Sequence, residues 1–523
     1  MKKPAKTPLF AFLRKAFFLA RKANSTHAPS GELVEELEEV SLSRRKFLGT
    51  SGKAILIGSI APQSIVPFFG KKSPRIAIIG GGMAGMNALH YLKKAGLEAT
   101  VYEASGRTGG RMFTVKGVMG EGTWTEFGGE FIDTQHLEMH RLKDEFGLEL
   151  MDTGADSELK LSKEAFFFDN RHYTWLRSSM PSAALPTSSG RYRQAPGRDY
   201  LPHSGPRHGS LRPHEPFRIP RIHQGFGLDE SLLENAYEAE YGLAPEEQSA
   251  INLLFLISTD TEGGHFDIFG ESDERYKIKG GNQSIPDAIA KKYPSDILLN
   301  RSLEMIDRRW THFRLKFSGM TEEVKADFVV MTIPFAKLQE VEVRVNMPKV
   351  KEECIRTIGF GTNSKVMMAF KKHYWREKGY LGFTYSDNGI QTGWDNAQLQ
   401  NADNQAAGYS ILLGGPAGVS VGQRPGFDQS EVYLPKVEQV FPGISQFYAG
   451  KTALMHWPSQ PFTLGSYVCY RPGQYTSIAG AEIEPVGDLY FAGEHCGGES
   501  AGFMNGAAQS GRDAAEASIK KGF

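Results

Sequence analysis

Residues 75–85, RIAIIGGGMAG, decide the fold of this 523-residue chain. The first five residues of the stretch form an almost wholly apolar run, which is typical of a central strand in a parallel sheet. The run leads directly into the pattern G-x-G-x-x-G, and a helical pattern then extends to Gly96. A second apolar run follows at 99–102 and stops at Glu103. A strand, a glycine turn, a helix, a second strand and an acid in this order predict a Rossmann-type fold that binds a dinucleotide.

Each position of the glycine turn has its own physical role. We expect Gly80 to permit the tight turn, Gly82 to let the backbone approach a pyrophosphate, and Gly85 to let the helix pack closely on the strand. The helix N-terminus at 83–84 offers free N–H groups and the positive end of the helix dipole to phosphates. Glu103 can accept hydrogen bonds from ribose hydroxyls. The turn therefore predicts where each part of a dinucleotide binds.

The composition is that of an ordinary globular protein and disfavours several classes of function. Hydrophobic residues make up 40% and charged residues 23%, and the length allows two or three domains around a large core. Lys and Arg together number 60, as do Asp and Glu, so no net charge favours nucleic acid. Cys354, Cys469 and Cys496 are too scattered for a disulfide framework or a zinc site, and we expect no metal. No apolar run after residue 70 has transmembrane length.

The first 70 residues read as a leader rather than as part of the fold. Residues 43–48, SRRKFL, precede a mildly apolar stretch at 54–61, which predicts a twin-arginine export signal. The chain would then meet the twin-arginine export machinery and be periplasmic or exported. The alternative is a basic surface turn followed by a short core helix. No cleavage site is clear, so a retained anchor stays open. Residues 1–24 could form a basic helix that contacts an anionic membrane surface, or a solvated extension.

Further motifs resemble those of the flavin amine oxidase superfamily, which includes monoamine, polyamine and L-amino-acid oxidases. Residues 103–111, EASGRTGGR, resemble its E-A-x-x-R-x-G-G-R extension, and 126–131, EFGGEF, resemble its next Gly-Gly turn. The closing block of the family resembles 488–494, DLYFAGE, with 502–507, GFMNGA. The resemblance covers roughly 72–165 and 230–523. It implies FAD as the cofactor.

The resemblance assigns the cofactor contacts residue by residue. The two arginines of the extension would address the flavin phosphates, and the acid of the closing block would meet ribityl or phosphate groups. The helix that begins near residue 504 would point its N-terminus at the isoalloxazine carbonyl, where it stabilises negative charge. The expected cofactor-binding residues are Gly80, Gly82, Met83, Ala84, Gly85, Glu103, Ala104, Arg107, Gly110, Arg111, Gly128, Gly129, Glu130, Glu494, Phe503 and Met504.

The resemblance also implies a catalytic lysine. Residues 361–365, GTNSK, precede the apolar run 366–370 and resemble the G-x-x-x-K element of the family. There the lysine orients a water at the flavin N5, so we expect Lys365 to do so and to assist reoxidation by O2 through its charge. The alternative is a lysine at a strand start in solvent.

Aromatic residues of the expected substrate site come from two segments. Residues 456–467, HWPSQPFTLGSY, match the W-x-x-x-P-x-x-x-G-x-Y run of the family, which implies Trp457 and Tyr467 as walls that exclude water. Ordinary core packing is the alternative for both. Phe503 occupies the place of a tyrosine in animal monoamine oxidases, so their paired-tyrosine cage is incomplete here. Phe131 lies near the place where many L-amino-acid oxidases carry an arginine that binds the substrate carboxylate, which favours amines without that group.

One cysteine bears on how the flavin is held. Some family members link FAD covalently to a cysteine near the place of Cys469, but there the cysteine follows Gly-Gly, whereas here Gly465-Ser466 is followed by Tyr467. The register differs, so we predict non-covalent FAD.

The motifs divide the chain into interleaved segments. The predicted fold is an α/β Rossmann-type FAD-binding domain, made of 72–161, 271–344 and 456–523, interleaved with an α+β substrate domain of mixed sheet and helices, made of 162–270 and 345–455. Residues 176–222 are crowded with Pro, Arg, His, Ser and Gly and show no periodicity. They are either a disordered insertion or the product of a local frame disturbance in the gene, and the latter could impair activity.

The leading functional hypothesis is oxidation of an amine C–N bond by hydride transfer to FAD, followed by imine hydrolysis. O2 or a quinone would accept the electrons, with H2O2 as the product from O2. The alternatives are an L-amino-acid oxidase, a desaturase or porphyrinogen oxidase acting on a C–C or ring bond, and a non-catalytic FAD-binding protein. The sequence names neither the amine nor the oligomeric state.

Overall fold

The apolar run that opens the glycine motif is the centre of a parallel sheet. β1 (Ile76–Ile79) is buried along its whole length. It pairs on one side with β13 (Phe328–Met331) and on the other with β2 (Ala99–Tyr102), both in parallel. β20 (Leu489–Phe491) and β9 (Ile297–Leu298) complete the five-stranded sheet in the order β20-β13-β1-β2-β9. Five strands from different parts of the chain thus form one parallel sheet.

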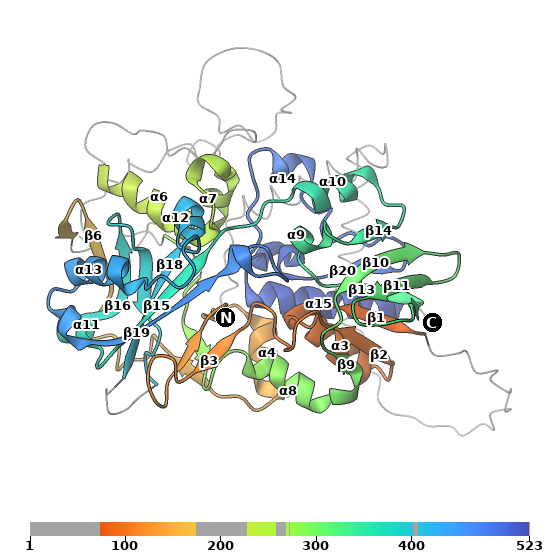
Figure 1. Cartoon of the computed structure of the whole chain (residues 1–523), viewed down its shortest axis with the longest axis horizontal. Helices are drawn as coiled ribbons and strands as arrows, with labels where there is room; N and C mark the ends of the chain where they lie inside the picture. The colour runs from red at the N-terminus through yellow and green to blue at the C-terminus, as the bar shows by residue number, and fades with distance from the viewer. Residues whose placement is uncertain (1–73, 174–226, 258–267, 271, 401–405, 522–523) are drawn as a thin grey trace, which may run out of the picture. The chain divides into compact units, whose positions relative to one another are not determined.

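Two helices that are distant in the sequence pack together against this sheet (Figure 1). α3 (Met83–Lys94) follows the glycine turn, and α15 (Met504–Lys520) closes the chain. A Cβ at Gly511 would lie 2.1 Å from the Ala84 carbonyl oxygen, so the absence of a side chain there lets the two backbones approach closely. The beginning and the end of the fold therefore meet at one place.

A four-stranded sheet lies next to the parallel sheet in the order β12-β11-β10-β14. Its strands are β12 (Val324–Ala326), β11 (Phe313–Phe317), β10 (Leu303–Arg308) and β14 (Glu342–Arg344). The Phe317 ring stacks on the Tyr102 ring of the parallel sheet at 4.3 Å, and both belong to one apolar cluster. Alternation of buried and accessible residues along β11 matches a strand with one face in this core.

The second large sheet has seven strands in the order β19-β15-β18-β17-β16-β6-β7. All its pairings are antiparallel except that between β16 and β6. β15 is buried along its whole length, from Ser364 to Phe370, and so is β17. The strands are β19 (Tyr448–His456), β15 (Ser364–Phe370), β18 (Ala407–Leu413), β17 (Gln391–Asp395), β16 (Tyr380–Ser386), β6 (Ser162–Phe168) and β7 (Arg171–Tyr173).

Shorter elements connect these sheets. Two-stranded sheets join β3 (Thr114–Lys116) to β4 (Trp124–Glu126) and β5 (Leu150–Asp152) to β8 (Tyr276–Ile278). The remaining α-helices are α4 (Leu137–Glu145), α6 (Gly227–Tyr241), α7 (Ala250–Leu256), α8 (Ser284–Lys292), α9 (Phe335–Leu338), α10 (Lys349–Thr357), α11 (Tyr374–Glu377), α12 (Gly415–Ser420), α13 (Ser430–Val440) and α14 (Gln474–Ser477).

The computed structural model describes residues 74–173, 227–257, 268–270, 272–400 and 406–521. Within these ranges no helix is both long and apolar enough to cross a membrane. The expected twin-arginine signal, the leader and the segment 176–222 lie outside the described residues. The prediction of a mixed α/β fold is confirmed, with both parallel and antiparallel sheets. The division into FAD-binding and substrate segments stays a prediction.

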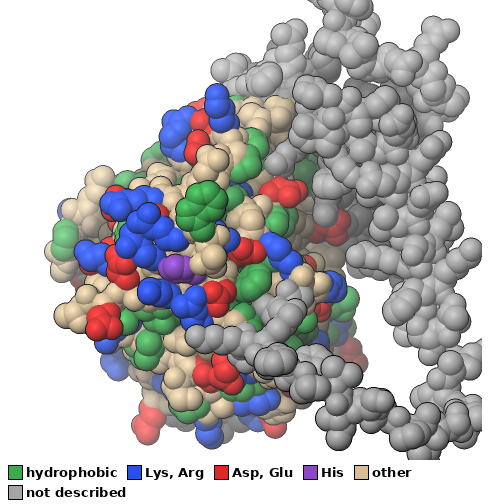
Figure 2. Space-filling view, turned by 90° about the vertical axis from the view of Figure 1, so that its right-hand side faces the viewer, with side chains coloured by type: hydrophobic (Ala, Val, Ile, Leu, Met, Phe, Trp, Pro, Cys, Tyr) green, Lys and Arg blue, Asp and Glu red, His purple; other side chains and the backbone are tan. Residues whose placement is uncertain are grey.

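Charges of opposite sign lie close together on the molecular surface. Figure 2 shows a face on which Lys and Arg side chains are interspersed with Asp and Glu side chains. Ion pairs of the four-stranded sheet follow the same pattern: Lys316 Nζ lies 2.9 Å from Glu304, and Arg314 lies 2.7 Å from Asp307. An exposed pair such as Lys316–Glu304 adds little stability, but it balances the surface charge.

Candidate active site

The expected site residues gather around one cavity of about 480 Å³. Its wall includes residues from the glycine turn, the Gly-Gly turn, the seven-stranded sheet and the start of α15. The expected residues that line it are Gly80, Gly82, Met83, Ala84, Glu103, Ala104, Arg107, Gly110, Arg111, Gly128, Gly129, Glu130, Lys365, Trp457, Tyr467, Glu494, Phe503 and Met504. Gly85 is not part of this lining.

Gly85 does not line the cavity, but it packs against the turn that does. A Cβ at Gly85 would lie 1.9 Å from the Gly80 carbonyl oxygen, so only glycine permits this contact between helix and turn. Gly80 has a φ of +107°, which also favours glycine. At Gly82, by contrast, a Cβ would meet no protein atom within 4 Å. The space above Gly82 is therefore open to a bound group.

The ends of two helices face this open space without caps. α3 begins after Gly82 and α15 begins after Phe503, and neither cap residue makes a side-chain capping hydrogen bond. Met83, Ala84 and Met504 of the first turns line the cavity. Free N–H groups at a helix N-terminus suit phosphates and other anions. The residues present thus fit a dinucleotide with a phosphate at α3 and a polar ring system at α15.

Glu103 is fixed by the backbone at the end of β2. Its Oε2 accepts a hydrogen bond from the Gly81 N–H at 2.6 Å. Its Oε1 accepts from the Ser105 N–H at 2.8 Å and from the Ser105 hydroxyl at 2.6 Å. The carboxylate therefore has a defined position at the cavity wall, and its contact with a ribose stays a prediction.

The two arginines of the loop after Glu103 are engaged with protein groups. Arg107 donates to the carbonyl oxygens of Thr108, Gly110 and Met112, at 3.1, 2.7 and 3.3 Å, and so shapes the loop. Burial lowers the pKa of its guanidinium. Arg111 donates from Nη1 to Glu494 at 2.8 Å and to the Ser466 carbonyl at 2.6 Å. Whether either arginine contacts phosphate stays a prediction.

The Arg111–Glu494 pair joins the two motif blocks across 383 residues of sequence. The other carboxylate oxygen of Glu494 accepts from the Gly502 N–H at 3.1 Å and from the Val468 N–H at 3.3 Å. Glu494 thus fixes the loop that leads into α15. Its role in the structure is to join the loop before α15 to the segment that carries Arg111.

Lys365 lies in the wall with its ammonium group fully engaged. It is 6% exposed, and Nζ donates to the carbonyl oxygens of Glu126 and Gly128 at 3.2 and 2.8 Å. The third contact is to Glu130 Oε2 at 3.0 Å. The solvent-exposed alternative for this lysine is therefore excluded. Because an ammonium has three donors, a water could be held at Nζ only by exchange with one of these contacts.

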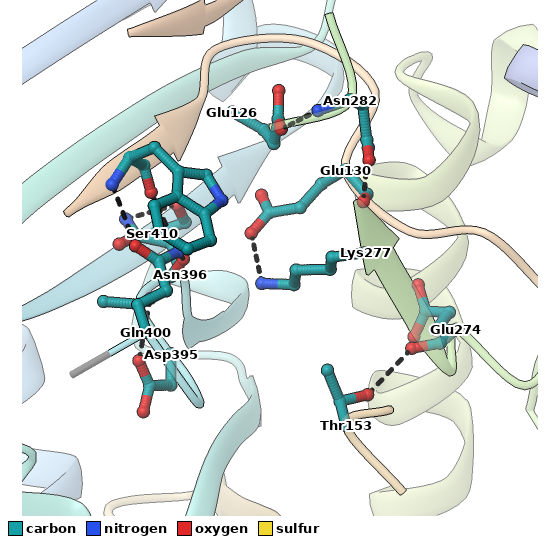
Figure 3. A network of polar contacts seen from close by, with 12 residues as sticks. Glu126, Glu130, Thr153, Glu274, Lys277, Asn282, Asp395, Asn396, Gln400 and Ser410 are labelled. Carbon is teal, nitrogen blue, oxygen red and sulfur yellow. Dashed lines mark hydrogen bonds and ion pairs between the residues drawn. The ribbon is translucent and has the colours of Figure 1, made fainter. Parts of the chain in front are cut away.

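Glu130 lies between two ammonium groups, one of which the sequence did not reveal. Lys277 of β8 donates to Glu130 Oε1 at 2.8 Å, a contact drawn in Figure 3. Lys365 contacts the other carboxylate oxygen, Oε2. Burial disfavours ionisation of Glu130, but Lys277 and Lys365 outweigh burial and hold its pKa below the usual range. This buried triad carries a net positive charge beside the cavity.

Hydrogen bonds from Asn282 hold the Gly-Gly turn in place. Its side-chain amide donates to the carbonyl oxygens of Gly129 and Glu130 at 3.1 and 2.7 Å. Its backbone N–H donates to Glu126 Oε1 at 2.7 Å, a contact drawn in Figure 3. Burial raises the pKa of Glu126 to about 7. Asn282 therefore positions the turn that carries Glu130.

Aromatic side chains form another part of the cavity wall, which we call the aromatic wall. Trp457 is buried, and its indole N–H donates to the Phe127 carbonyl at 3.2 Å. The Tyr467 hydroxyl donates to the Glu240 carbonyl oxygen. The Phe503 ring lies 5.1 Å from the His136 ring. All three line the cavity, together with Trp394, which the sequence did not single out.

Three acidic residues of the wall were also missed from the sequence. Asp133 follows the Gly-Gly block by a few residues, Glu240 lies near the end of α6, and Glu274 precedes β8. No motif marks them, because they come together only through the packing of α6 and β8 around the cavity. Position just after the Gly-Gly block was the one signal available, and it points to Asp133 alone.

The cysteines lie outside the cavity lining, and no metal centre accompanies them. All three are buried free thiols, and none lines the cavity. Cys469 accepts a hydrogen bond from the Asn252 side chain at 3.4 Å, and burial raises the pKa of its thiol. Among the residues that the structure describes, no group of three or more His, Cys, Asp and Glu side chains could hold a metal ion.

Comparison with known families gives one match over most of the chain. The family model described as flavin containing amine oxidoreductase matches residues 83–519. A flavin-containing amine oxidase of Danio rerio is 24% identical over 463 residues, which cover 84% of each protein. An L-amino acid dehydrogenase of Synechocystis sp. is 23% identical over 467 residues, which cover 84% of this chain and 94% of that one.

Solved structures share the fold. A double mutant of putrescine oxidase superposes with a TM-score of 0.68 at 18% identity, covering 86% of this chain and 99% of that one. Cyclohexylamine oxidase from Brevibacterium oxydans gives the same TM-score, identity and coverage.

Proposed function

Because the chain belongs to the flavin containing amine oxidoreductase family, we propose that it oxidises the C–N bond of a small amine, with FAD held non-covalently. The observation that carries the proposal is the convergence on one cavity of two uncapped helix N-termini, at Gly82 and Phe503, with the buried Lys365. FAD, when bound, supplies the two-electron acceptor for such a reaction.

The residues of the wall suit the binding of an amine next to the cofactor. Trp457, Tyr467 and Phe503 present apolar surface that excludes water and favours a neutral amine over its ammonium form. The N-terminus of α15 directs N–H groups into the cavity, where they stabilise negative charge. The Lys277–Glu130–Lys365 triad keeps a net positive charge at the Gly-Gly turn. That charge would favour electron transfer to O2, and a quinone is the alternative acceptor.

Non-covalent attachment of FAD is supported by the position of the cysteines. Cys469 lies behind the wall and its thiol is held protonated by burial, so it is poorly placed to form a bond with the cofactor. We expect acid precipitation of the holoprotein to release all flavin into the supernatant. A yellow pellet would contradict non-covalent binding.

The lining favours an amine that carries no carboxylate. Among the cationic side chains that line the cavity, Lys365 is paired with Glu130 and Arg111 with Glu494. Phe131, where an arginine would serve a carboxylate, lines the cavity as an apolar ring. An L-amino acid would therefore bring its carboxylate to a site in which these two cations are already paired.

Location and export enter the proposal from the sequence alone. The segment 43–48 supports export by the twin-arginine route to the periplasm, with FAD inserted before transport.

The test of the proposed activity is an anaerobic titration of the full-length holoprotein. Monoamines, diamines, polyamines and L-amino acids are added separately, and the flavin absorbance is followed. We expect amines to bleach the flavin and, after O2 is admitted, to release H2O2. If no amine bleaches the flavin while it remains bound, the proposed activity is wrong.

A further inference from the structure

Three carboxyl groups that no Lys or Arg of the described residues contacts occupy the substrate end of the cavity. Asp133, Glu240 and Glu274 all line it. They lie beside the aromatic wall, since the Glu240 carbonyl accepts from the Tyr467 hydroxyl and His136 contacts both Asp133 and the Phe503 ring. We call Asp133, Glu240 and Glu274 the acidic pocket.

The other carboxylates of the cavity wall have partners. Glu130 is paired with two ammonium groups, Glu494 with Arg111, and Glu103 with backbone N–H groups. In contrast, the carboxyl groups of Glu240 and Glu274 form no hydrogen bond or ion pair with any residue that the structure describes. The two glutamates of the acidic pocket therefore lack the protein partners that the other carboxylates of the wall have.

Asp133 is hydrogen-bonded but has no Lys or Arg partner. It accepts from the Ser272 hydroxyl at 2.8 Å and from the Glu274 N–H at 3.0 Å. His136 Nε2 lies 3.4 Å from it, but burial lowers the pKa of His136 to about 4, so this ring is neutral at physiological pH. Asp133 thus adds a third carboxyl group that no Lys or Arg of the described residues contacts.

The surroundings make these charges costly. Both glutamates are partly buried, and burial raises the pKa of Glu240 to about 7 and that of Glu274 to about 8. Burial likewise raises the pKa of Asp133 to about 6. Repulsion among the three carboxyls adds to burial, with Glu130 and Asp273 acting in the same direction and Lys163 against it. A bound cation would remove this cost by supplying the missing partner.

We propose that the acidic pocket binds a second cationic group of the substrate, so that the site takes a diamine or longer polyamine in preference to a monoamine or an amino acid. This inference rests on the proposed oxidation of amines. One amine nitrogen would lie among the aromatic residues beside the cofactor, and the distal ammonium would lie among the three carboxyls. Tyr241 and Tyr467, which border the pocket, add ring faces that attract a cation.

The first experiment measures binding without turnover. The full-length holoprotein is reduced with dithionite, so that it cannot oxidise an amine, and is titrated calorimetrically with 1,5-diaminopentane and with n-pentylamine. The two probes differ by one terminal ammonium. We expect the diamine to bind about 10- to 100-fold more tightly. Equal affinities would overturn the inference.

Variants locate the difference. Glu240→Gln and Glu274→Gln keep the side-chain shape, and each should lose about tenfold in diamine affinity while the affinity for n-pentylamine is unchanged. Glu322→Gln, at an exposed position outside the cavity, is the matched control and should retain the preference. A preference that survives in both cavity variants would place the second ammonium elsewhere and overturn the inference. Retained flavin absorbance reports that each variant is folded.

Proton release gives a second readout that a structural effect would not produce. Because a cation favours ionised carboxyls, diamine binding at pH 7 should release more protons than n-pentylamine binding, seen as a stronger dependence of the binding heat on the ionisation enthalpy of the buffer. The excess should fall in Glu240→Gln and Glu274→Gln. Equal proton release with the two probes would contradict the inference.

Anaerobic bleaching of the oxidised holoprotein separates this inference from the proposed function. If monoamines bleach the flavin at concentrations as low as diamines do, the proposed amine oxidation stands. The inferred role of the acidic pocket is then wrong. L-Lysine or L-arginine bleaching at lower concentration than any diamine would likewise overturn it in favour of a basic amino acid. Absence of bleaching by every amine, despite diamine binding, would overturn the proposed function.

Discussion

The two sides of the cavity treat buried charge in opposite ways. At the Gly-Gly turn, Glu130 is held between Lys277 and Lys365, and each of these contacts is 3.0 Å or shorter. At the substrate end, Glu240 and Glu274 have carboxyl groups with no partner in the described chain. Paired charges position the backbone and resist change, because loss of one partner leaves the others uncompensated. Unpaired charges keep their interaction free energy available for a ligand. We therefore assign a positioning role to the paired carboxylate and a role in ligand recognition to the unpaired ones.

The largest effect is expected from breaking the paired side. Glu130→Gln leaves two buried ammonium groups without their counter-ion, and we expect it to lower the free energy of unfolding by about 3–5 kcal/mol. Chemical denaturation of the holoprotein at pH 7 measures this. Glu240→Gln is the comparison on the unpaired side and should cost less than about 0.5 kcal/mol. Equal losses in the two variants would remove the distinction.

The next effect concerns the two lysines of the triad. Lys365→Met removes the ammonium that lines the cavity, and we expect reoxidation of reduced flavin by O2 to slow by about 10- to 100-fold. Lys277→Met removes an ammonium that contacts the same carboxylate but does not line the cavity, so it should slow reoxidation less. Stopped-flow absorbance after mixing with O2 measures both. Identical rates in Lys365→Met and the parent would remove Lys365 from this role.

The free energy of unfolding should depend on pH through Glu274, on the unpaired side of the cavity. Glu274 has a pKa near 4.5 when unfolded and about 8 when folded, because burial disfavours its charge. Its contribution to stability is therefore full below about pH 4.5 and is lost as the pH rises to about 8. Glu274→Gln removes this loss, so relative to the parent it should gain about 1–2 kcal/mol between pH 5 and pH 8. Denaturation at a series of pH values tests it, and a gain that shrinks with rising pH would contradict the assignment.

The smallest effect is expected where the aromatic wall meets the acidic pocket. Tyr467→Phe loses the hydrogen bond to the Glu240 carbonyl and should lower the free energy of unfolding by about 1 kcal/mol. Calorimetric affinity for a diamine should fall by less than in Glu240→Gln, because the carboxyl itself remains. A larger fall would mean that the hydroxyl contacts the ligand directly.

Much of the fold could be predicted because the signals are local. The apolar run and the glycines around Gly82 predicted β1, α3 and β2, and the closing block predicted β20 and the start of α15. Strand and helix patterns depend on neighbours within a few residues, and a left-handed φ such as that of Gly80 favours glycine directly. The expected cofactor and substrate residues, apart from Gly85, line one cavity for the same reason: motifs record backbone geometry.

The sequence by itself determined the mixed α/β class, the family resemblance and the turns that approach a dinucleotide. Only the tertiary structure decided which charges are paired. Lys277 and Glu130 are 147 residues apart, and no motif in either segment predicts their contact. Glu240 and Glu274 lie in different segments, and only the cavity that both line identifies them as candidate ligand-binding residues. The physical reason is that backbone conformation is governed by short-range sterics, whereas the ionisation and partners of a side chain depend on all that is packed around it.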